Sequence, residues 1–122
     1  MALLESGEMY LETILVLASR METVRAIDIS EHMGFSKPSV SRALSRLREE
    51  GYVTVSEPGA IAFTEAGRAV AEKIYARHTL LTELLERIGV SAETAREDAC
   101  RIEHDISDET FAALKIHIKT HK

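Results

Sequence analysis

The sequence has a single cysteine among its 122 residues and contains no long apolar run. One cysteine cannot form a disulfide within the chain, so nothing indicates an oxidising compartment. No apolar stretch approaches the ~20 residues that cross a bilayer. The first residues, MALLESGEMYLE, carry acids where a signal peptide would have a basic region. No internal repeat or low-complexity segment is present. These absences favour a cytoplasmic protein with no membrane partner.

The composition is that of a folded globular chain, with 45% hydrophobic and 29% charged residues. The length predicts one domain, or two small ones that share helices. The formal net charge of -5 by itself argues weakly against nucleic acid as a partner. The charge is unevenly distributed, however, because residues 36–48 contain four basic side chains and no acidic one.

Residues 24–50 have the pattern of a helix-turn-helix. The apolar spacing predicts a short helix over 24–33, which Gly34 ends, and a second helix that runs to about Glu50. Ser36 is a suitable N-cap for the second helix, and Pro38 lies in its first turn, where a missing N–H has no cost. This second helix is therefore the candidate recognition helix.

The outward face of that helix is suited to double-stranded DNA. Small hydroxyl side chains permit close approach to a duplex, and arginines can reach phosphates or guanine edges. A solvated amphipathic helix would be the alternative for a basic face alone. We predict that the operator DNA is contacted by Ser36, Lys37, Pro38, Ser39, Ser41, Arg42 and Arg46.

Two short β-prone runs follow, at 52–56 and 61–63, on either side of a turn that contains Pro58 and Gly59. A helix-turn-helix followed directly by a hairpin is the winged-helix arrangement. The sequence thus predicts a mainly α protein, with a winged helix-turn-helix DNA-binding domain over residues 1–64.

Residues 65–122 are predicted to form a helical metal-binding and dimerisation domain. Its first helix, from Thr64 to Ile88, has more apolar surface than one small domain can cover, which favours a homodimer. Further helices are expected from Ala92 to about Asp105 and after Ser107.

The segment Cys100-Arg-Ile-Glu103-His104 places three metal-binding side chains at i, i+3 and i+4. On a helix, all three share one face. A divalent cation would neutralise the anions and fill the space between them. Met9 and Glu12 lie three residues apart on the first helix, although a core methionine and a solvated glutamate would have the same spacing.

In their order and spacing, these motifs resemble the diphtheria toxin repressor family of metal-dependent regulators, including its manganese transport regulator branch. The resemblance covers nearly the whole chain and is carried by residues 8–12, 36–41, 63–67, 77–78, 100–104 and 107–109. It implies a transcriptional repressor that senses Fe(II) or Mn(II), with one or two ions per subunit, and controls metal-uptake or homeostasis genes. The metal ligands that it implies are Met9, Glu12, His78, Cys100, Glu103 and His104.

This ligand set is a hybrid of the two branches. Glu12 with His78 matches the manganese type, and the other four match the primary site of the iron type. The iron branch has an ancillary site with an acid and a histidine where this chain has Thr82 and Arg96, so the resemblance does not extend to that site. A thiolate and a thioether favour Fe(II) over Mn(II).

Three other functions are compatible with parts of the pattern. One is a winged-helix transcription regulator that is not controlled by metal. The second is an enzyme with Cys100 as nucleophile and His104 as base, which would lack any nearby oxyanion-hole or glycine-rich motif. The third is a structural zinc site, but six candidate ligands exceed the four that such a site uses.

Overall fold

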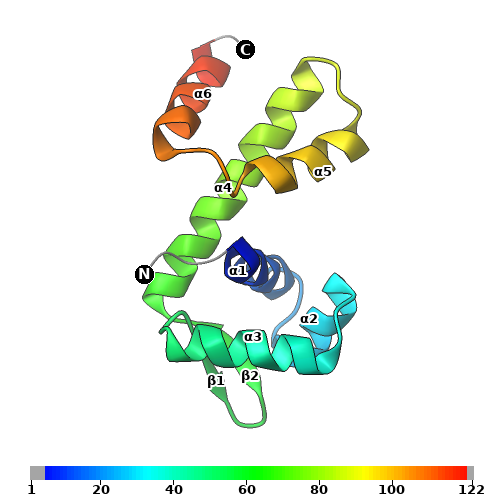
Figure 1. Ribbon diagram of the computed structural model, residues 1–122, viewed down its shortest axis with the longest axis vertical. Helices are drawn as coiled ribbons and strands as arrows, with labels where there is room; N and C mark the ends of the chain where they lie inside the picture. Colours follow the sequence, from blue (N-terminus) through cyan, green and yellow to red (C-terminus); the bar gives the residue numbers. More distant parts are fainter. Residues whose placement is uncertain (1–4, 121–122) are drawn as a thin grey trace. The chain divides into compact units, whose positions relative to one another are not determined.

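The computed structural model describes residues 5–120, and the ends of the two predicted domains, residues 1–4 and 121–122, lie outside the described residues. Contacts divide the chain into unit 1, Met1–Glu72, and unit 2, Lys73–Lys122. The fold is mainly helical, as predicted, with one antiparallel hairpin among residues 5–120 (Figure 1). In chain order the elements are α1 (Glu5–Ala18), α2 (Ala26–Met33), α3 (Lys37–Glu49), β1 (Val53–Ser56), β2 (Ala60–Phe63), α4 (Glu65–Arg87), α5 (Ala92–Ile102) and α6 (Asp108–Thr120).

In unit 1, α2 ends and α3 begins where the capping residues predict. Gly34 follows α2 with φ of 74°, and its N–H donates to the carbonyl of Ser30 at 2.9 Å. The hydroxyl of Ser36 accepts the N–H of Ser39 at 3.3 Å, and Pro38 lies in the first turn of α3. The prediction of a helix-turn-helix is confirmed.

The wing has one strand partner that the sequence did not predict. β1 and β2 pair in antiparallel register from Val53 with Phe63 to Ser56 with Ala60. Val24, expected in a helix, is instead extended, and its carbonyl accepts the N–H of Ile61 at 2.8 Å. The prediction that a helix starts at Val24 was therefore wrong, because this β-branched residue is buried beside β2.

One hydrophobic core joins the helices of unit 1 to its hairpin. Leu11 and Ile14 of α1, Val40 and Leu47 of α3, and Val53 of β1 are almost completely buried. Burial of one such side chain stabilises a fold by roughly 1.5–3 kcal/mol. Ile27 of α2 is 40% exposed, whereas Ile29 is fully buried and occupies the inward position of this short helix.

In unit 2, α5 and α6 lie on either side of the later part of α4 (Figure 1). Ala95 and Ala99 of α5 are fully buried, and side chains this small allow close contact between helices. Ser91 caps α5 by accepting the N–H of Thr94 at 3.4 Å. Within residues 5–120, no helix is both long enough and apolar enough to cross a membrane.

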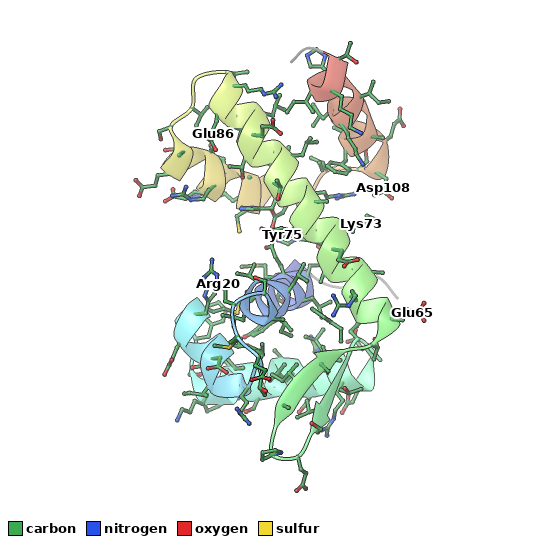
Figure 2. The ribbon with its side chains drawn as sticks, turned by 180° about the vertical axis from the view of Figure 1, so that it is seen from behind. Arg20, Glu65, Lys73, Tyr75, Glu86 and Asp108 are labelled. Atoms are coloured by element: carbon green, nitrogen blue, oxygen red, sulfur yellow. The ribbon has the colours of Figure 1, made fainter. Side chains whose placement is uncertain are left out.

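An ion pair ties the start of α6 to α4. The carboxylate of Asp108 lies 2.9 Å from the ammonium of Lys73 and also pairs with Arg77, and Figure 2 shows Lys73 and Asp108 next to each other. Lys73, and to a lesser extent Arg77, lower the pKa of Asp108 from its ordinary value of 3.8. The ionised carboxylate is thus favoured in the folded state.

We expect this pair to make stability depend on pH in the acidic range. A lowered pKa stabilises the fold at pH values above the ordinary one, and the stabilisation is lost as the pH falls through the folded-state pKa. Asp108→Asn should therefore be less stable than wild type at neutral pH, with the difference vanishing in strongly acidic buffer. Urea unfolding at both pH values measures this, with exposed Glu109→Gln as the matched control.

Candidate metal centre

The carboxylate of Glu103 is fully buried between two imidazoles in unit 2. Its Oε2 lies 2.8 Å from Nδ1 of His78, which is on α4. Its Oε1 lies 3.5 Å from Nε2 of His104 and has no hydrogen-bond partner among residues 5–120. A buried carboxylate is costly unless it is paired or bound to a metal. Within residues 5–120, this carboxylate has one oxygen without a hydrogen bond, and imidazole nitrogens lie close by. Such a set of donor atoms fits a divalent cation.

The end of α5 explains how Glu103 and His104 reach this position. The helix ends at Ile102, so the predicted continuation to about Asp105 was wrong. Glu103 still has helical backbone angles, and its N–H donates to the carbonyl of Ala99 at 2.9 Å. The N–H of Asp105 then donates to the carbonyl of Ile102. This hydrogen bond spans three residues, as in a 3₁₀ turn, and it turns the chain out of the α-helix.

The six predicted ligands are divided between the two units. Met9 and Glu12 lie on α1 in unit 1, three residues apart and half-buried. In unit 2, His78, Glu103 and His104 lie together, and Cys100 is half-buried on α5, three residues before Glu103. The His104 side chain is only 1% exposed.

A hollow beside His78 contains both positions at which the chain departs from the iron branch. This open hollow has a volume of about 640 Å³. Thr82 and Arg96, which are far apart in the sequence, both line it, as do the acidic side chains of Glu83 and Glu86. An arginine in place of a histidine supplies a fixed cation instead of a metal ligand.

The predicted DNA-contacting residues lie in α3 and at its N-cap. Six of the seven are exposed, and Ser39 is half-buried. The hydroxyls of Ser36 and Ser39 hydrogen-bond to each other at 2.9 Å, so these two side chains also fix the start of the helix. A guanidinium nitrogen of Arg42 lies 3.4 Å from the Ser39 hydroxyl.

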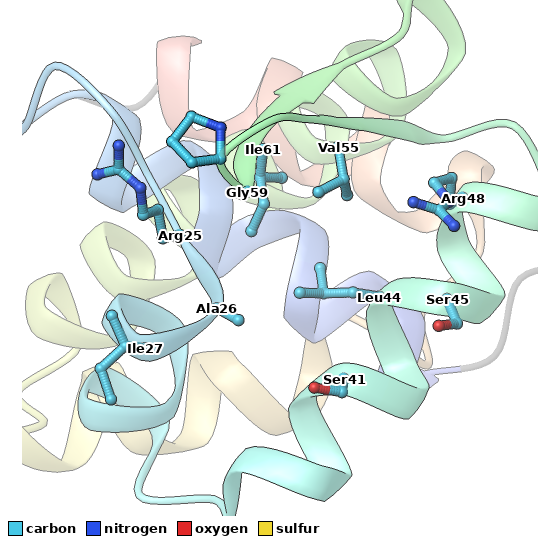
Figure 3. A pocket seen from close by; sticks show the side chains of 11 residues that line it. Arg25, Ala26, Ile27, Ser41, Leu44, Ser45, Arg48, Val55, Gly59 and Ile61 are labelled. Carbon is cyan, nitrogen blue, oxygen red and sulfur yellow. The ribbon is translucent and has the colours of Figure 1, made fainter.

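Two further arginines lie near this face and were missing from the predicted contacts. Arg25 and Arg48 line a hollow of about 360 Å³ between α2, α3 and the wing. Figure 3 shows them on opposite sides of the hollow, with Ser41 and Ser45 along α3. Arg48 belongs to the basic run of the sequence, whereas no local pattern singles out Arg25. Arginine side chains beside a recognition helix often contact phosphates.

The two halves of the chain match two models of one protein family. The "Iron dependent repressor, N-terminal DNA binding domain" matches residues 2–61, and the "Iron dependent repressor, metal binding and dimerisation domain" matches residues 64–121. The chain belongs to the iron-dependent repressor family. The resemblance seen in the motifs is thereby confirmed.

Named members of the iron-dependent repressor family are similar over most of the chain. The "Transcriptional regulator MntR" of Escherichia coli O6:H1 is 31% identical over 112 residues, which are 92% of this chain and 72% of the relative. The "Diphtheria toxin repressor" of Corynebacterium diphtheriae is 34% identical over 113 residues, which are 92% of this chain and 50% of the relative.

Solved structures of similar proteins have the same fold. The manganese regulator SloR is 28% identical with a TM-score of 0.81, over 93% of this chain and 53% of that one. The hypothetical protein SSo2273 from Sulfolobus solfataricus is 25% identical with a TM-score of 0.72, over 95% of this chain and 89% of that one. The chain thus spans about half the length of SloR and of the diphtheria toxin repressor.

Proposed function

We propose that this chain is a DNA-binding transcriptional repressor whose affinity for its operator depends on Fe(II) or Mn(II). The observation that carries the proposal is the buried carboxylate of Glu103 between two imidazoles, in a chain whose other half is a winged helix with a basic recognition helix. The regulated genes would be those of metal uptake or homeostasis. The role is regulatory, with no substrate turnover, and is carried out in the cytoplasm, where operator DNA is accessible.

The proposed ligands are the six predicted from the sequence, which would bind one or two ions per subunit. Carboxylates and imidazoles suit both Mn(II) and Fe(II), and the softer sulfur atoms of Met9 and Cys100 favour Fe(II). Met9 and Glu12 belong to unit 1 and the other four ligands to unit 2. An ion bound by both groups would link metal binding to the arrangement of the DNA-binding half. Such coupling typically amounts to about 1–3 kcal/mol.

The proposed division of labour follows the two halves of the sequence, with DNA binding in residues 1–64 and metal binding and dimerisation in residues 65–122. Apolar side chains that remain exposed in unit 2 support a homodimer, notably Ile88 at 71%, Ile116 at 67% and Tyr75 at 45% exposed. A two-fold dimer would present two copies of α3 about one helical turn of DNA apart, roughly 34 Å.

Selection from a random double-stranded DNA library tests the function, because it does not require that the operator sequence be known. The chelator-treated protein is used alone, with Mn(II), and with Fe(II) under anaerobic conditions. We expect a two-fold symmetric sequence to be enriched only when one of these ions is present. Enrichment of the same sequence without any metal would favour a winged-helix regulator that metal does not control.

The recognition helix gives a separate prediction. Arg46→Ala should weaken operator binding and lower the slope of log K against log salt by about 1, because each phosphate contact releases counterions. Fluorescence anisotropy at several salt concentrations measures both effects. Arg101→Ala, on α5 outside the DNA-binding half, is the control and should leave the slope unchanged. An unchanged slope for Arg46→Ala would exclude Arg46 from the phosphate contacts.

A further inference from the structure

Arg77 is a buried arginine that binds the turn between α5 and α6. It lies on α4 and is 6% exposed. Its Nη1 donates hydrogen bonds to the carbonyls of Glu103 and Ile106, at 3.1 and 2.9 Å. Its Nη2 donates to the carboxylate of Asp108, and the guanidinium lies 5.6 Å from the ring centre of Phe111. One side chain on α4 thus holds both ends of this turn.

The turn held by Arg77 carries two of the proposed metal ligands. One of its two carbonyl partners belongs to Glu103 itself, and His104 lies between the two partners in the chain. Arg77 is also the peptide neighbour of His78 on α4. Its hydrogen bonds therefore connect the α4 backbone beside His78 to the turn that carries Glu103 and His104.

The chemistry of these contacts requires an arginine. The carbonyl of Glu103, at the C-cap of α5, has no partner within that helix and carries partial negative charge. A guanidinium presents several N–H groups in a planar fork, so it can satisfy two carbonyls and a carboxylate at once. A lysine ammonium is a point charge on a flexible stem and lacks this fixed geometry.

We propose that Arg77 is a positioning residue for the metal site, which presets the spacing between His78 and the Glu103–His104 pair before an ion binds. This inference rests on the proposed function. It means that part of the metal affinity and of the coordination geometry depends on a residue that is not itself a ligand. A turn that is already fixed does not have to be ordered when the metal binds, which favours binding.

Metal binding by variants of the full chain tests this role. Affinity for Mn(II) is measured on chelator-treated protein by competition with a fluorescent chelator, and the visible spectrum of bound Co(II) reports the coordination geometry. We expect Arg77→Gln to weaken Mn(II) binding about 10–100-fold, the loss typical when a residue that orients a ligand is removed. The Co(II) bands should also shift. Arg77→Lys should fall between Arg77→Gln and wild type.

Arg87 offers a matched control on the same helix. Its guanidinium donates to the carbonyl of Ile118 at 3.2 Å and to the carboxylate of Glu83 at 2.8 Å, so it joins α4 to α6 through partners that are not proposed ligands. Arg87→Gln should lower the unfolding temperature of the metal-free protein without changing Mn(II) affinity or the Co(II) spectrum. Equal losses of affinity in Arg87→Gln and Arg77→Gln would overturn the positioning role, because both would then reflect general stability.

The remaining outcomes separate the inference from the function on which it rests. If wild type binds Mn(II) and the Arg77 variants bind it equally well with unchanged Co(II) bands, Arg77 does not position the ligands. If wild type binds neither Mn(II) nor, under anaerobic conditions, Fe(II), the proposed function itself fails. Should Arg77→Gln not fold, Arg77→Lys decides, since wild-type affinity and spectrum in that variant would also overturn the inference.

Discussion

Glu103→Gln is expected to remove most of the stabilisation by Mn(II) while leaving the metal-free protein at least as stable as wild type. The wild-type carboxylate is fully buried, and one of its oxygens has no hydrogen-bond partner within the described residues. An amide of nearly the same shape removes the cost of burying a carboxylate charge and can still form a hydrogen bond with the His78 imidazole. The same change removes an anionic ligand from the proposed site. The variant should thus keep the stability of the metal-free protein but lose most of the stabilisation by Mn(II), and a variant that simply unfolds would not show this combination.

The size of the expected effect follows from linkage between binding and folding. At a metal concentration 100 times the dissociation constant, binding stabilises the folded state by about 2.7 kcal/mol. If the variant binds about 100-fold more weakly, the gain at the same concentration falls to about 0.4 kcal/mol. Urea unfolding of chelator-treated protein, with and without Mn(II), measures both quantities. Glu97→Gln, an exposed position on the same helix, is the control and should retain the full gain.

A different result would identify a structural role for the buried carboxylate. If Glu103→Gln destabilises the metal-free protein strongly and retains the Mn(II) gain, the contacts of Glu103 with His78 and His104 serve the fold alone. The proposed metal site would then have to do without its central ligand.

The features that were predictable from the sequence are those set by local chemistry. Gly34 ends α2 because it readily adopts positive φ, and Ser36 starts α3 because its hydroxyl accepts a backbone N–H in the first turn. Both effects act over a few residues, so the sequence alone reveals them. The pairing of β1 with β2 was predictable for the same reason, since a short turn fixes which strands meet.

The features that were missed depend on contacts between distant parts of the chain. Val24 is extended because of its hydrogen bond to Ile61, and nothing near Val24 in the sequence indicates that partner. In the same way, Arg77 can hold the turn between α5 and α6 only because the fold brings the carbonyl of Glu103, 26 residues later in the chain, next to its guanidinium. The cluster Cys100–His104 did single out Glu103 and His104 as candidate ligands. However, the burial of Glu103 and its contact with His78 required the fold.

Gly67→Ala is expected to destabilise unit 1, although alanine normally stabilises a helix relative to glycine. Gly67 is buried in the first turn of α4, against the backbone of Tyr52 at the start of the wing. A Cβ at position 67 would lie 1.8 Å from the carbonyl oxygen of Tyr52. That oxygen also accepts the N–H of Thr64 at 3.1 Å, so it cannot move without loss of a hydrogen bond. The backbone of the wing would have to shift.

The sign of the effect decides whether this close approach exists in solution. A glycine to alanine change within a helix usually stabilises it by about 0.5–1 kcal/mol, whereas overpacking costs about 1–3 kcal/mol or more. Gly51→Ala is the contrasting control. A Cβ added at position 51 would lie in open space, but Gly51 has a φ of 85°, so only backbone strain opposes this change. We expect urea unfolding to show a larger loss of stability for Gly67→Ala than for Gly51→Ala.

Operator binding by Gly67→Ala should also weaken, because the wing is displaced from α3. A gain in stability for Gly67→Ala would mean that the wing does not pack against the start of α4 as closely as described.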